Sequence, residues 1–383
     1  MNTLMRLALL GIALLLGGCF GSKDNMELPT PLVEFTQKLT VEEVWSASAG
    51  GRSDLTKLTP TRQGDTLFTA TAAGLIRAFT LSDGQRLWEH QVKDRILTGG
   101  VGVGDDLVLV GSRNGQVIAL AASDGSERWQ AQVSSEVLSA PRAQGGVVVA
   151  RSLDGKLYGL DSQSGRGLWV YERTVPLLTL RGTSSPVIAA DAVIAGFDSG
   201  KLAALQLTSG KLLWEIAVAL PRGRSELERM VDIDADPVIK GDTIYTTSFR
   251  GRVVAVDQKG SLVWEREISS YAGLNVDATA VYVSDEKSHL WAFDRTSGAS
   301  LWKQEKLQAR EITAPAILDK TIVVGDKEGY LHWLRQEDGQ FVARHRTGKN
   351  PITVPPLVVG DLLIVYTSAG EITALRSTVS AKR

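Results

Sequence analysis

The residues best suited to chemistry are three alternating aspartates and a small set of histidines. Asp232, Asp234 and Asp236 stand in the run VDIDADP, a spacing found in calcium-binding loops. Such a loop needs glycine at its sixth position and glutamate at its twelfth, where this chain has Pro237 and Thr243. The four histidines show no metal-binding spacing, and the chain has neither a G-x-S-x-G elbow nor a Walker A loop. The sequence therefore predicts no catalytic residue, no metal site and no cofactor.

Two further features resemble functional motifs at first sight. The segment GVGVG (100–104) looks like a phosphate loop, but it precedes a strand-like run and not a helix, so a β-hairpin is the better interpretation. The single cysteine excludes an internal disulfide, a cysteine-rich zinc site and an iron–sulfur cluster. With 42 Lys and Arg against 43 Asp and Glu, the chain lacks the basic excess of proteins that bind nucleic acid independently of sequence, so no nucleic-acid partner is expected.

The single cysteine, Cys19, ends a segment with the composition of a secretory signal. Arg6 precedes an apolar run over 7–16, which is too short to span ~30 Å of hydrocarbon as a helix. The sequence LGGC (16–19) resembles a bacterial lipobox, which implies cleavage before Cys19 and lipidation of that residue. Phe20 stands where inner-membrane retention would use aspartate. The resemblance thus implies a lipid anchor in the outer membrane, on its periplasmic face.

From residue 40 onward the chain repeats a unit of about 42 residues. Clear copies are GKLYGLDSQSGRGLW (155–169) and GKLAALQLTSGKLLW (200–214), and eight copies begin at residues 74, 115, 155, 200, 251, 288, 329 and 370. Within a copy, glycine-containing turns separate short runs in which apolar residues alternate, as they do in β-strands. A period of ~40–45 residues is typical of four-stranded propeller blades.

Prolines give a second, independent spacing. They stand fourteen residues before the start of six repeats, at positions 60, 141, 186, 237, 315 and 356. Proline has no N–H to give to a ladder, so this position predicts the innermost strand of each blade. The last copy lacks a fourth strand, and VEEVW (41–45) is a lone strand before the first copy. We therefore predict an all-β fold, an eight-bladed β-propeller of four-stranded antiparallel blades over 40–383, closed by its N-terminal strand. A signal peptide (1–18) and a lipid-anchored tether (19–39) would precede it.

Tryptophan follows the same repeat. Seven of the nine tryptophans occupy one repeat position, at residues 45, 88, 129, 169, 214, 264 and 302. A ring of aromatic ligand contacts is one interpretation, and a wedge that fills the space between neighbouring sheets is the other. Packing is needed around the whole ring and ligand binding is not, so the wedge is favoured.

Two connections between repeats are longer than the others. The distance from the repeat tryptophan to the next inner-strand proline is 17 residues from 169 to 186 and 23 residues from 214 to 237. These connections join neighbouring blades and emerge on one face, where repeat proteins often bind their partners. The first carries Leu178, Leu180 and Arg181; the second carries a short helical turn, with Asp232 and Asp234 expected to face solvent. By spacing alone, a solvated loop remains the alternative to a binding site.

The core AFDRTSGASLW (292–302) resembles the repeat of PQQ-like propellers. Together with the lipobox, the motifs VPLLTLRG (175–182), ERMVDIDADP (228–237) and VVGDKEGYLHW (323–333) resemble the BamB family, lipoprotein propellers of the outer-membrane β-barrel assembly complex. The resemblance implies a non-enzymatic scaffold that binds the periplasmic POTRA domains of BamA and assists insertion of β-barrel proteins. It further implies indirect association with other lipoproteins of the complex and contact with unfolded outer-membrane clients.

By motif, the family's BamA-contacting residues correspond to Leu178, Leu180, Arg181, Asp232 and Asp234. Two alternatives stay open. One is a periplasmic adaptor for another partner. The other is a relative of PQQ-dependent dehydrogenases, although catalytic members carry a vicinal cysteine pair that this chain lacks.

Overall fold

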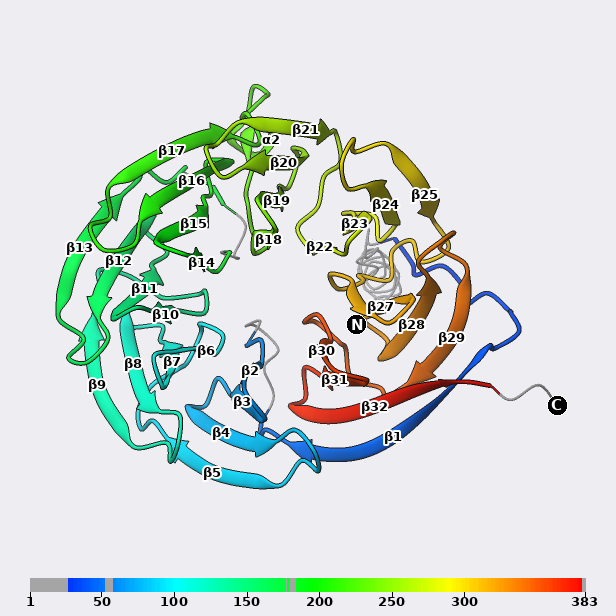
Figure 1. Ribbon diagram of the computed structural model, residues 1–383, viewed down its shortest axis with the longest axis horizontal. Coiled ribbons are helices and arrows are strands. Elements are labelled where there is room, and N and C mark those ends of the chain that lie inside the picture. The colour runs from blue at the N-terminus through cyan, green and yellow to red at the C-terminus, as the bar shows by residue number, and fades with distance from the viewer. Residues whose placement is uncertain (1–26, 52–57, 177, 180–183, 381–383) are drawn as a thin grey trace, which may run out of the picture.

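The computed structural model describes residues 27–51, 58–176, 178–179 and 184–380. In this part of the chain, eight four-stranded antiparallel sheets are arranged as the blades of a ring (Figure 1). The predicted eight-bladed β-propeller is therefore confirmed. None of the helical segments in the described ranges has the length and apolarity to span a bilayer.

The blades are numbered in chain order, with the strands of each given from the centre of the ring to its rim. Blade 1 consists of β2 (Thr61–Gln63), β3 (Thr66–Ala70), β4 (Leu75–Thr80) and β5 (Arg86–Gln91), and blade 2 consists of β6 (Gly102–Gly104), β7 (Leu107–Gly111), β8 (Gln116–Ala121) and β9 (Glu127–Gln132). Blade 3 consists of β10 (Arg142–Gln144), β11 (Val147–Arg151), β12 (Lys156–Asp161) and β13 (Gly167–Glu172). Blade 4 consists of β14 (Val187–Ala189), β15 (Ala192–Gly196), β16 (Lys201–Gln206) and β17 (Leu212–Ala217). Blade 5 consists of β18 (Val238–Lys240), β19 (Thr243–Thr247), β20 (Val253–Asp257) and β21 (Leu262–Arg266), and blade 6 consists of β22 (Gly273–Val276), β23 (Ala280–Ser284), β24 (Leu290–Asp294) and β25 (Ser300–Gln304). Blade 7 consists of β26 (Ala316–Leu318), β27 (Thr321–Gly325), β28 (Tyr330–Arg335) and β29 (Phe341–Arg346). Blade 8 consists of β30 (Leu357–Val359), β31 (Leu362–Tyr366), β32 (Glu371–Val379) and β1 (Leu39–Ser48). One short helix, α2 (Glu226–Arg229), lies between blades 4 and 5.

The ring closes where the first and the last strand meet. Strand β1 pairs antiparallel with β32 from Leu39↔Val379 to Ser48↔Glu371, and so supplies the fourth strand of blade 8. Figure 1 shows β1 and β32 side by side. The prediction that residues 41–45 complete the last blade is confirmed.

The local sequence explains where the inner strands begin. The six repeat prolines each immediately precede an innermost strand of three residues, so their missing N–H falls just outside the ladder. The glycine-rich segment 100–104 likewise contributes β6, which forms a hairpin with β7 as expected. A Cβ on Gly102 would lie 1.6 Å from the Pro141 carbonyl oxygen of the next blade, so only glycine fits there.

The core is divided into clusters between successive blades. Between blades 1 and 2, for example, Phe68 and Ile76 pack against Val108 and Ile118, all of them buried. A single blade has two apolar faces and cannot cover them alone, so neighbouring blades bury them for one another. The ring arrangement follows from that requirement.

The repeat tryptophans link each blade to the next. Each of the seven donates its Nε1–H to a backbone carbonyl of the following blade, at 2.7–3.0 Å. The ring of Trp129, for instance, lies against the turn glycine Gly165. The wedge interpretation is confirmed. In β29 the position is taken by Ala343, because the fourth strand of blade 8 comes from the N-terminus and no hairpin turn is present to receive an indole.

Every outermost strand also carries a β-bulge next to that position. The ladder between the third and fourth strands skips the residue just before the tryptophan, as at Leu213, where Ala204 pairs with Trp214 and Leu205 pairs with Leu212. The same irregularity occurs in all eight blades. Bulges of this kind bend an edge strand and limit its pairing with another chain.

Candidate functional site

The two long connections lie on one face of the ring. The first joins β13 to β14 over residues 173–186, and the second joins β17 to β18 over 218–237. Because the strands of each blade alternate in direction, these connections emerge on the same face as the turns between the second and third strands, such as residues 248–252 of blade 5. This face of blades 3 to 5 is the candidate site.

In the first connection, Leu178 has 46% of its surface exposed, as expected for an interface anchor. Leu180 and Arg181 lie outside the described residues, as does the lipidation candidate Cys19. Their roles in binding stay predictions.

A buried ion pair supports the end of this first connection. Arg151, at the end of β11, forms an ion pair with Asp198 in the β15–β16 turn, and both side chains are buried. Arg151 also donates a hydrogen bond of 3.3 Å to the hydroxyl of Ser184, and its guanidinium lies 5.4 Å from the centre of the Phe197 ring. A charged pair in the interior holds its partners firmly, because losing either one leaves an uncompensated charge. Blades 3 and 4 are thus fastened together beneath the first connection.

The second connection is held by a well-capped turn of helix. The Ser225 hydroxyl accepts the backbone N–H of Glu228 at 3.2 Å, and the Glu228 carboxylate accepts the N–H groups of Ser225 at 3.1 Å and Arg224 at 2.7 Å. These backbone hydrogen bonds, from Arg224 first and Ser225 second, lower the pKa of Glu228. Arg250 in the β19–β20 turn donates to the carbonyl of Leu227, which ties α2 to blade 5. The expected helical turn is confirmed.

One expectation about the aspartates is wrong. Asp232 was expected to face solvent, yet its exposed fraction is 0%. Its carbonyl accepts the N–H of Phe249 at 2.8 Å in an isolated β-bridge, and its neighbours Val231 and Ile233 are buried. The run 231–235 is therefore inserted between blades 4 and 5, which takes the Asp232 side chain inside. Asp234 is half-buried.

Asp236 links the ends of the two connections. It accepts the backbone N–H of Ser185 at 2.5 Å, and its carboxylate lies 3.9 Å from the guanidinium of Arg142. Pro237 follows Asp236 and immediately precedes β18, as the sequence indicated. The ends of the two loops are therefore joined by a hydrogen bond near the innermost strands.

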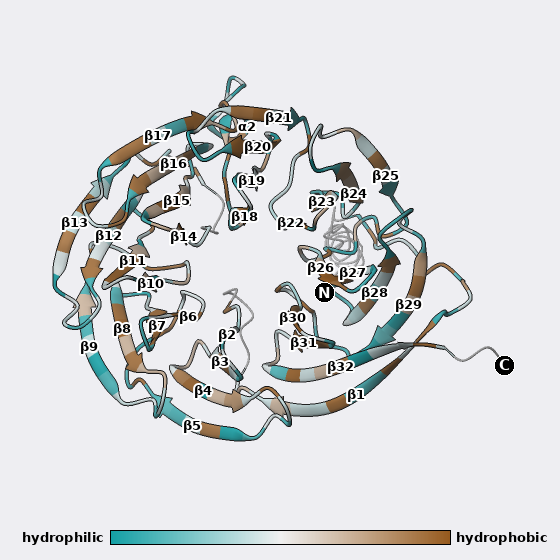
Figure 2. Ribbon diagram, in the orientation of Figure 1, coloured by the Kyte–Doolittle hydropathy of each residue, from teal (hydrophilic) through white to brown (hydrophobic). Residues whose placement is uncertain are grey.

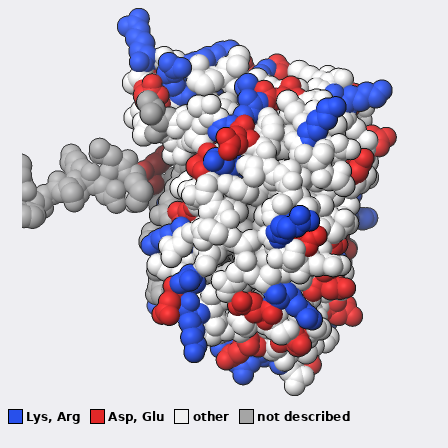
Figure 3. Space-filling view, turned by 90° about the vertical axis from the view of Figure 1, so that its left-hand side faces the viewer, with Lys and Arg blue, Asp and Glu red and all other residues white. Residues whose placement is uncertain are grey.

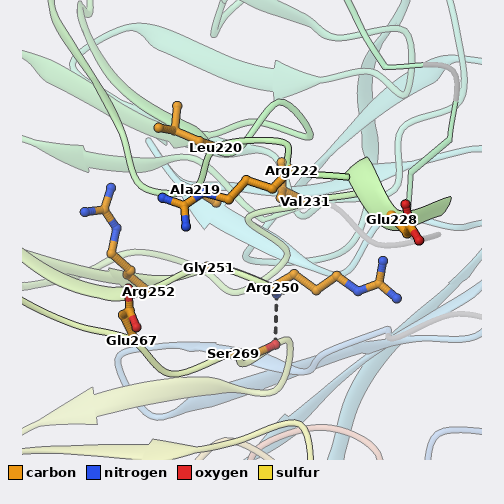
Figure 4. Close-up of a pocket in the computed structure, with 10 residues that line it drawn as sticks. All are labelled: Ala219, Leu220, Arg222, Glu228, Val231, Arg250, Gly251, Arg252, Glu267 and Ser269. Carbon is orange, nitrogen blue, oxygen red and sulfur yellow. Dashed lines mark hydrogen bonds between the residues drawn. The ribbon is translucent and has the colours of Figure 1, made fainter. Parts of the chain in front are cut away.

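A cavity of about 500 Å³ opens beside the second connection (Figure 4). Its charged lining comes from three segments: Arg222 and Glu228 from the connection, Arg250 and Arg252 from the β19–β20 turn, and Glu267 from the segment after β21. Leu220, Val231 and Ala219 supply an apolar part. The lining thus combines three guanidinium groups, two carboxylates and a small apolar surface.

Some of these charges are already engaged. Arg252 forms an ion pair with Glu265 and donates to the Val218 carbonyl at 3.1 Å. In Figure 4 the Arg250 side chain points toward Glu228, and the charge of Arg250 contributes to the lowered pKa of that carboxyl. For Arg222, no ion pair is found within the described part of the chain. The cavity therefore offers an available cation beside apolar side chains, a mixture typical of protein interfaces.

On the rim at the side of β9, β13 and β17, neither sign of charge dominates (Figure 3). Figure 3 views the rim on the side of β9, β13 and β17, where Lys and Arg are interspersed with Asp and Glu. Among the described residues no group of three or more His, Cys, Asp and Glu side chains is arranged to hold a metal ion. The arrangement is suited to recognising a partner through a local patch.

Sequence reasoning missed Arg151 and the arginines of the cavity. Arg151 had a detectable signal, because it is the charged end of an otherwise apolar strand (VVVAR, 147–151). At the same position most other blades have a small residue, such as Gly111 and Gly196. The cavity had none, since its lining is assembled from three segments far apart in the repeat.

Comparison with known proteins adds an independent line of evidence. The family model described as outer membrane protein assembly factor BamB matches residues 72–304. The BamB protein of Pseudomonas aeruginosa is 43% identical over 370 residues, covering 96% of this chain and 97% of the relative. That of Alkalilimnicola ehrlichii is 41% identical over 373 residues, covering 97% and 96% respectively.

Solved structures give the same picture. The crystal structure of BamB from Moraxella catarrhalis aligns with a TM-score of 0.81 at 29% identity, covering 88% of this chain and 100% of that one. A quinohemoprotein alcohol dehydrogenase from Comamonas testosteroni aligns with a TM-score of 0.69 at 13% identity, covering 89% and 77%. The second likeness concerns the fold alone.

Proposed function

This chain belongs to the BamB family of outer membrane protein assembly factors, and on that premise we propose that it is a non-enzymatic scaffold of the β-barrel assembly complex. The scaffold binds the periplasmic POTRA domains of BamA through the face formed by the two long connections. It thereby assists the insertion of β-barrel proteins into the outer membrane and meets the other lipoproteins of the complex indirectly.

The observation that carries the proposal is the make-up of that face. An exposed leucine, Leu178, stands on one connection, and the neighbouring connection borders a cavity in which Arg222 has an available charge. An apolar anchor beside a cation suits a partner that presents an apolar pocket flanked by carboxylates. We assign Leu178, Leu180 and Arg181 to direct contact with BamA.

The two aspartates have a different part in this proposal. The Asp232 side chain is buried, so it serves binding through the shape of the face, and its backbone carbonyl fixes the second connection against Phe249 of blade 5. Asp234, which is half-buried, lies two residues further along the same inserted run. Replacing either would weaken binding by disturbing the shape of the face.

The test is a direct titration of the mature protein with the purified periplasmic region of BamA, by isothermal calorimetry. Leu178→Ala/Arg181→Ala should weaken the affinity at least about ten-fold, roughly 1.4 kcal/mol. Leu87→Ala is the matched control, because Leu87 is similarly exposed but lies on β5, away from both connections. Equal affinity of the double variant and wild type would refute the assigned face, and quinone-dependent dye reduction by the protein would refute the non-enzymatic role.

The proposed location rests on Cys19 as a lipidated residue, with anchoring in the outer membrane and the propeller on the periplasmic side. A residue that carries more than one acyl chain attaches a protein stably to the membrane. Mass spectrometry of the membrane-extracted protein should show the modification, and Cys19→Ala should release the protein into the soluble periplasmic fraction. An unmodified Cys19 in the membrane fraction would contradict the anchor.

A further inference from the structure

The chain covers one of its own blade edges with an extended segment. Just before β1, the backbone N–H of Lys38 donates to the carbonyl of Val342 in the rim strand β29, at 2.7 Å. The Gln37 side chain binds the backbone of Arg344. Its Oε1 accepts the Arg344 N–H at 3.2 Å, and its Nε2 donates to the Arg344 carbonyl at 3.4 Å. These are outward-facing backbone groups of an edge strand, satisfied here by an added segment.

Apolar side chains accompany these hydrogen bonds. Phe35 stacks on Phe341 with ring centres 5.5 Å apart, and Val33 packs against the same cluster. The Arg344 guanidinium lies 5.0 Å from the centre of the Phe35 ring and donates to the Val33 carbonyl at 3.1 Å. Phe341 is buried in this cluster, although it stands on the rim of the ring. Val342 is buried in the neighbouring cluster, against which Leu39 and Val41 of β1 pack. The bound segment is short and extended, and it places apolar residues at alternating positions.

The same two positions are apolar and uncovered in two other blades. Counting from the repeat tryptophan, Phe341 and Val342 correspond to Leu212 and Leu213 in β17 and to Leu262 and Val263 in β21. These four side chains are 41%, 52%, 51% and 52% exposed, in the same order. Figure 2 shows brown, apolar stretches on β17, β21 and β29 at the rim.

The remaining rim strands do not share this pattern. At the two positions they carry one apolar side chain or none: Arg86 and Leu87, Glu127 and Arg128, Gly167 and Leu168, Ser300 and Leu301, Glu43 and Val44. Paired apolar residues at the bulge are thus confined to blades 4, 5 and 7. In blade 7 the pair has its covering segment within the chain.

We propose that the rim edges of β17 and β21 bind a short extended segment of an unfolded polypeptide that carries apolar side chains at alternating positions. The binding mode is that of residues 33–38 on β29, with a backbone hydrogen bond to the carbonyl of the bulge residue and apolar contacts beside it. Strands of an unfolded transmembrane β-barrel have this alternation. The proposal concerns the rim, and so goes beyond the two-loop face assigned to BamA.

The bulge determines how much of the edge is usable. A bulge disrupts the regular ladder, so a long flat strand cannot pair along the whole edge, and stable aggregation through it is disfavoured. In blade 7 the carbonyl of the bulge residue Val342 is nevertheless an acceptor. Leu213 and Val263 hold the equivalent bulge positions. The edges are therefore suited to brief, low-affinity capture of segments similar in length to residues 33–38.

The test uses a fluorescein-labelled peptide of about twelve residues, alternating Phe or Val with Thr or Gln, and the mature wild-type protein. Its fluorescence anisotropy should rise in a saturable way. The same peptide methylated at all its backbone nitrogens should bind at least about ten-fold more weakly, because it cannot donate to the edge. Equal binding by the two peptides would overturn the strand-addition mode.

Variants then locate the binding surface. Leu213→Asp/Val263→Asp should weaken peptide binding at least about ten-fold, whereas Leu87→Asp at the same bulge position of β5 should not. Titration with the periplasmic region of BamA should be unchanged in the double variant, which separates this inference from the proposed function. A photo-crosslinker at Leu212 in the otherwise wild-type chain should capture the peptide. Equal peptide binding by the double variant, no crosslink from Leu212, or a concentration-dependent dimer of the protein that the double variant abolishes, would overturn the proposal.

Discussion

Replacing Gly165 with alanine should destabilise the propeller by roughly 2–5 kcal/mol, through two effects that the structure allows to be separated. Gly165 has a φ of +71°, a conformation that costs a residue with a Cβ roughly 1–2 kcal/mol. The added Cβ would also lie 2.5 Å from the Trp129 ring of the preceding blade. Forcing an extra methyl into such packing typically costs ~1–3 kcal/mol more.

Gly145 in the same blade is the matched control. Its φ is +61°, and a Cβ there would meet nothing within 4 Å, so Gly145→Ala should cost only the backbone contribution, roughly 1–2 kcal/mol. In a Trp129→Leu background, Gly165→Ala should fall to the same value, because the ring that it strikes is gone. The free energies of unfolding come from urea titrations followed by far-UV circular dichroism. Equal destabilisation by Gly165→Ala and Gly145→Ala would refute the role assigned to the tryptophan wedge.

Three further outcomes follow from the contacts. Trp45→Ala removes the indole that joins the closing strand to blade 1, and should lower the free energy of unfolding by ~3–5 kcal/mol; an unchanged thermal midpoint would contradict ring closure by β1. Asp198→Asn leaves the Arg151 charge buried without its counter-charge and should cost ~3–5 kcal/mol in urea titration. Asp338→Asn is the control: it breaks the partly exposed pair with Arg335 and should lower the free energy of unfolding by less than about 1 kcal/mol. Equal losses of stability in the two variants would contradict the role assigned to the buried pair. Burial lowers the pKa of His332 from its usual 6.5, so the unfolded chain takes up a proton that the folded chain resists. The contribution of His332 to stability should therefore be complete above pH 6.5 and decrease as the pH falls below that value. In His332→Gln the thermal midpoint should depend less on pH over this range. An identical pH dependence in the variant and the wild type would contradict the role of His332.

Most of the architecture was predictable because each blade corresponds to one copy of a sequence repeat. Fixed spacing of turn glycines, inner-strand prolines and rim tryptophans identifies the blades one by one. The missing fourth strand of the last copy and the extra strand at 41–45 together predict closure. The segment 33–38 was less predictable: it belongs to no repeat, and its packing on β29 depends on two phenylalanines, Phe35 and Phe341, that meet across the rim.

The candidate site was predictable only in outline. The lengths of the two connections locate the face, and the exposure of Leu178 agrees with the expectation. The alternating aspartates indicated a loop exposed to solvent. The bridge between Asp232 and Phe249 instead holds residues 231–235 inside the protein, and Phe249 belongs to the β19–β20 turn of the next blade. The cavity depends on Arg222 and Arg250, whose proximity is set by the way α2 is fastened to blade 5. Such tertiary contacts leave no periodic signal.

The pairing of β1 with β32 has a consequence for how the protein folds. Residues 39–48 find their partners at 371–379, so the contacts that close the ring span nearly the whole chain. Contacts of such high sequence separation are slow to form, because a long loop must be closed before they stabilise anything. A chain that emerges N-terminus first thus carries β1 without its partner strand until residues 371–379 arrive. We therefore expect closure to be the last step of folding, and loss of β32 to leave the earlier blades in a ring that does not close.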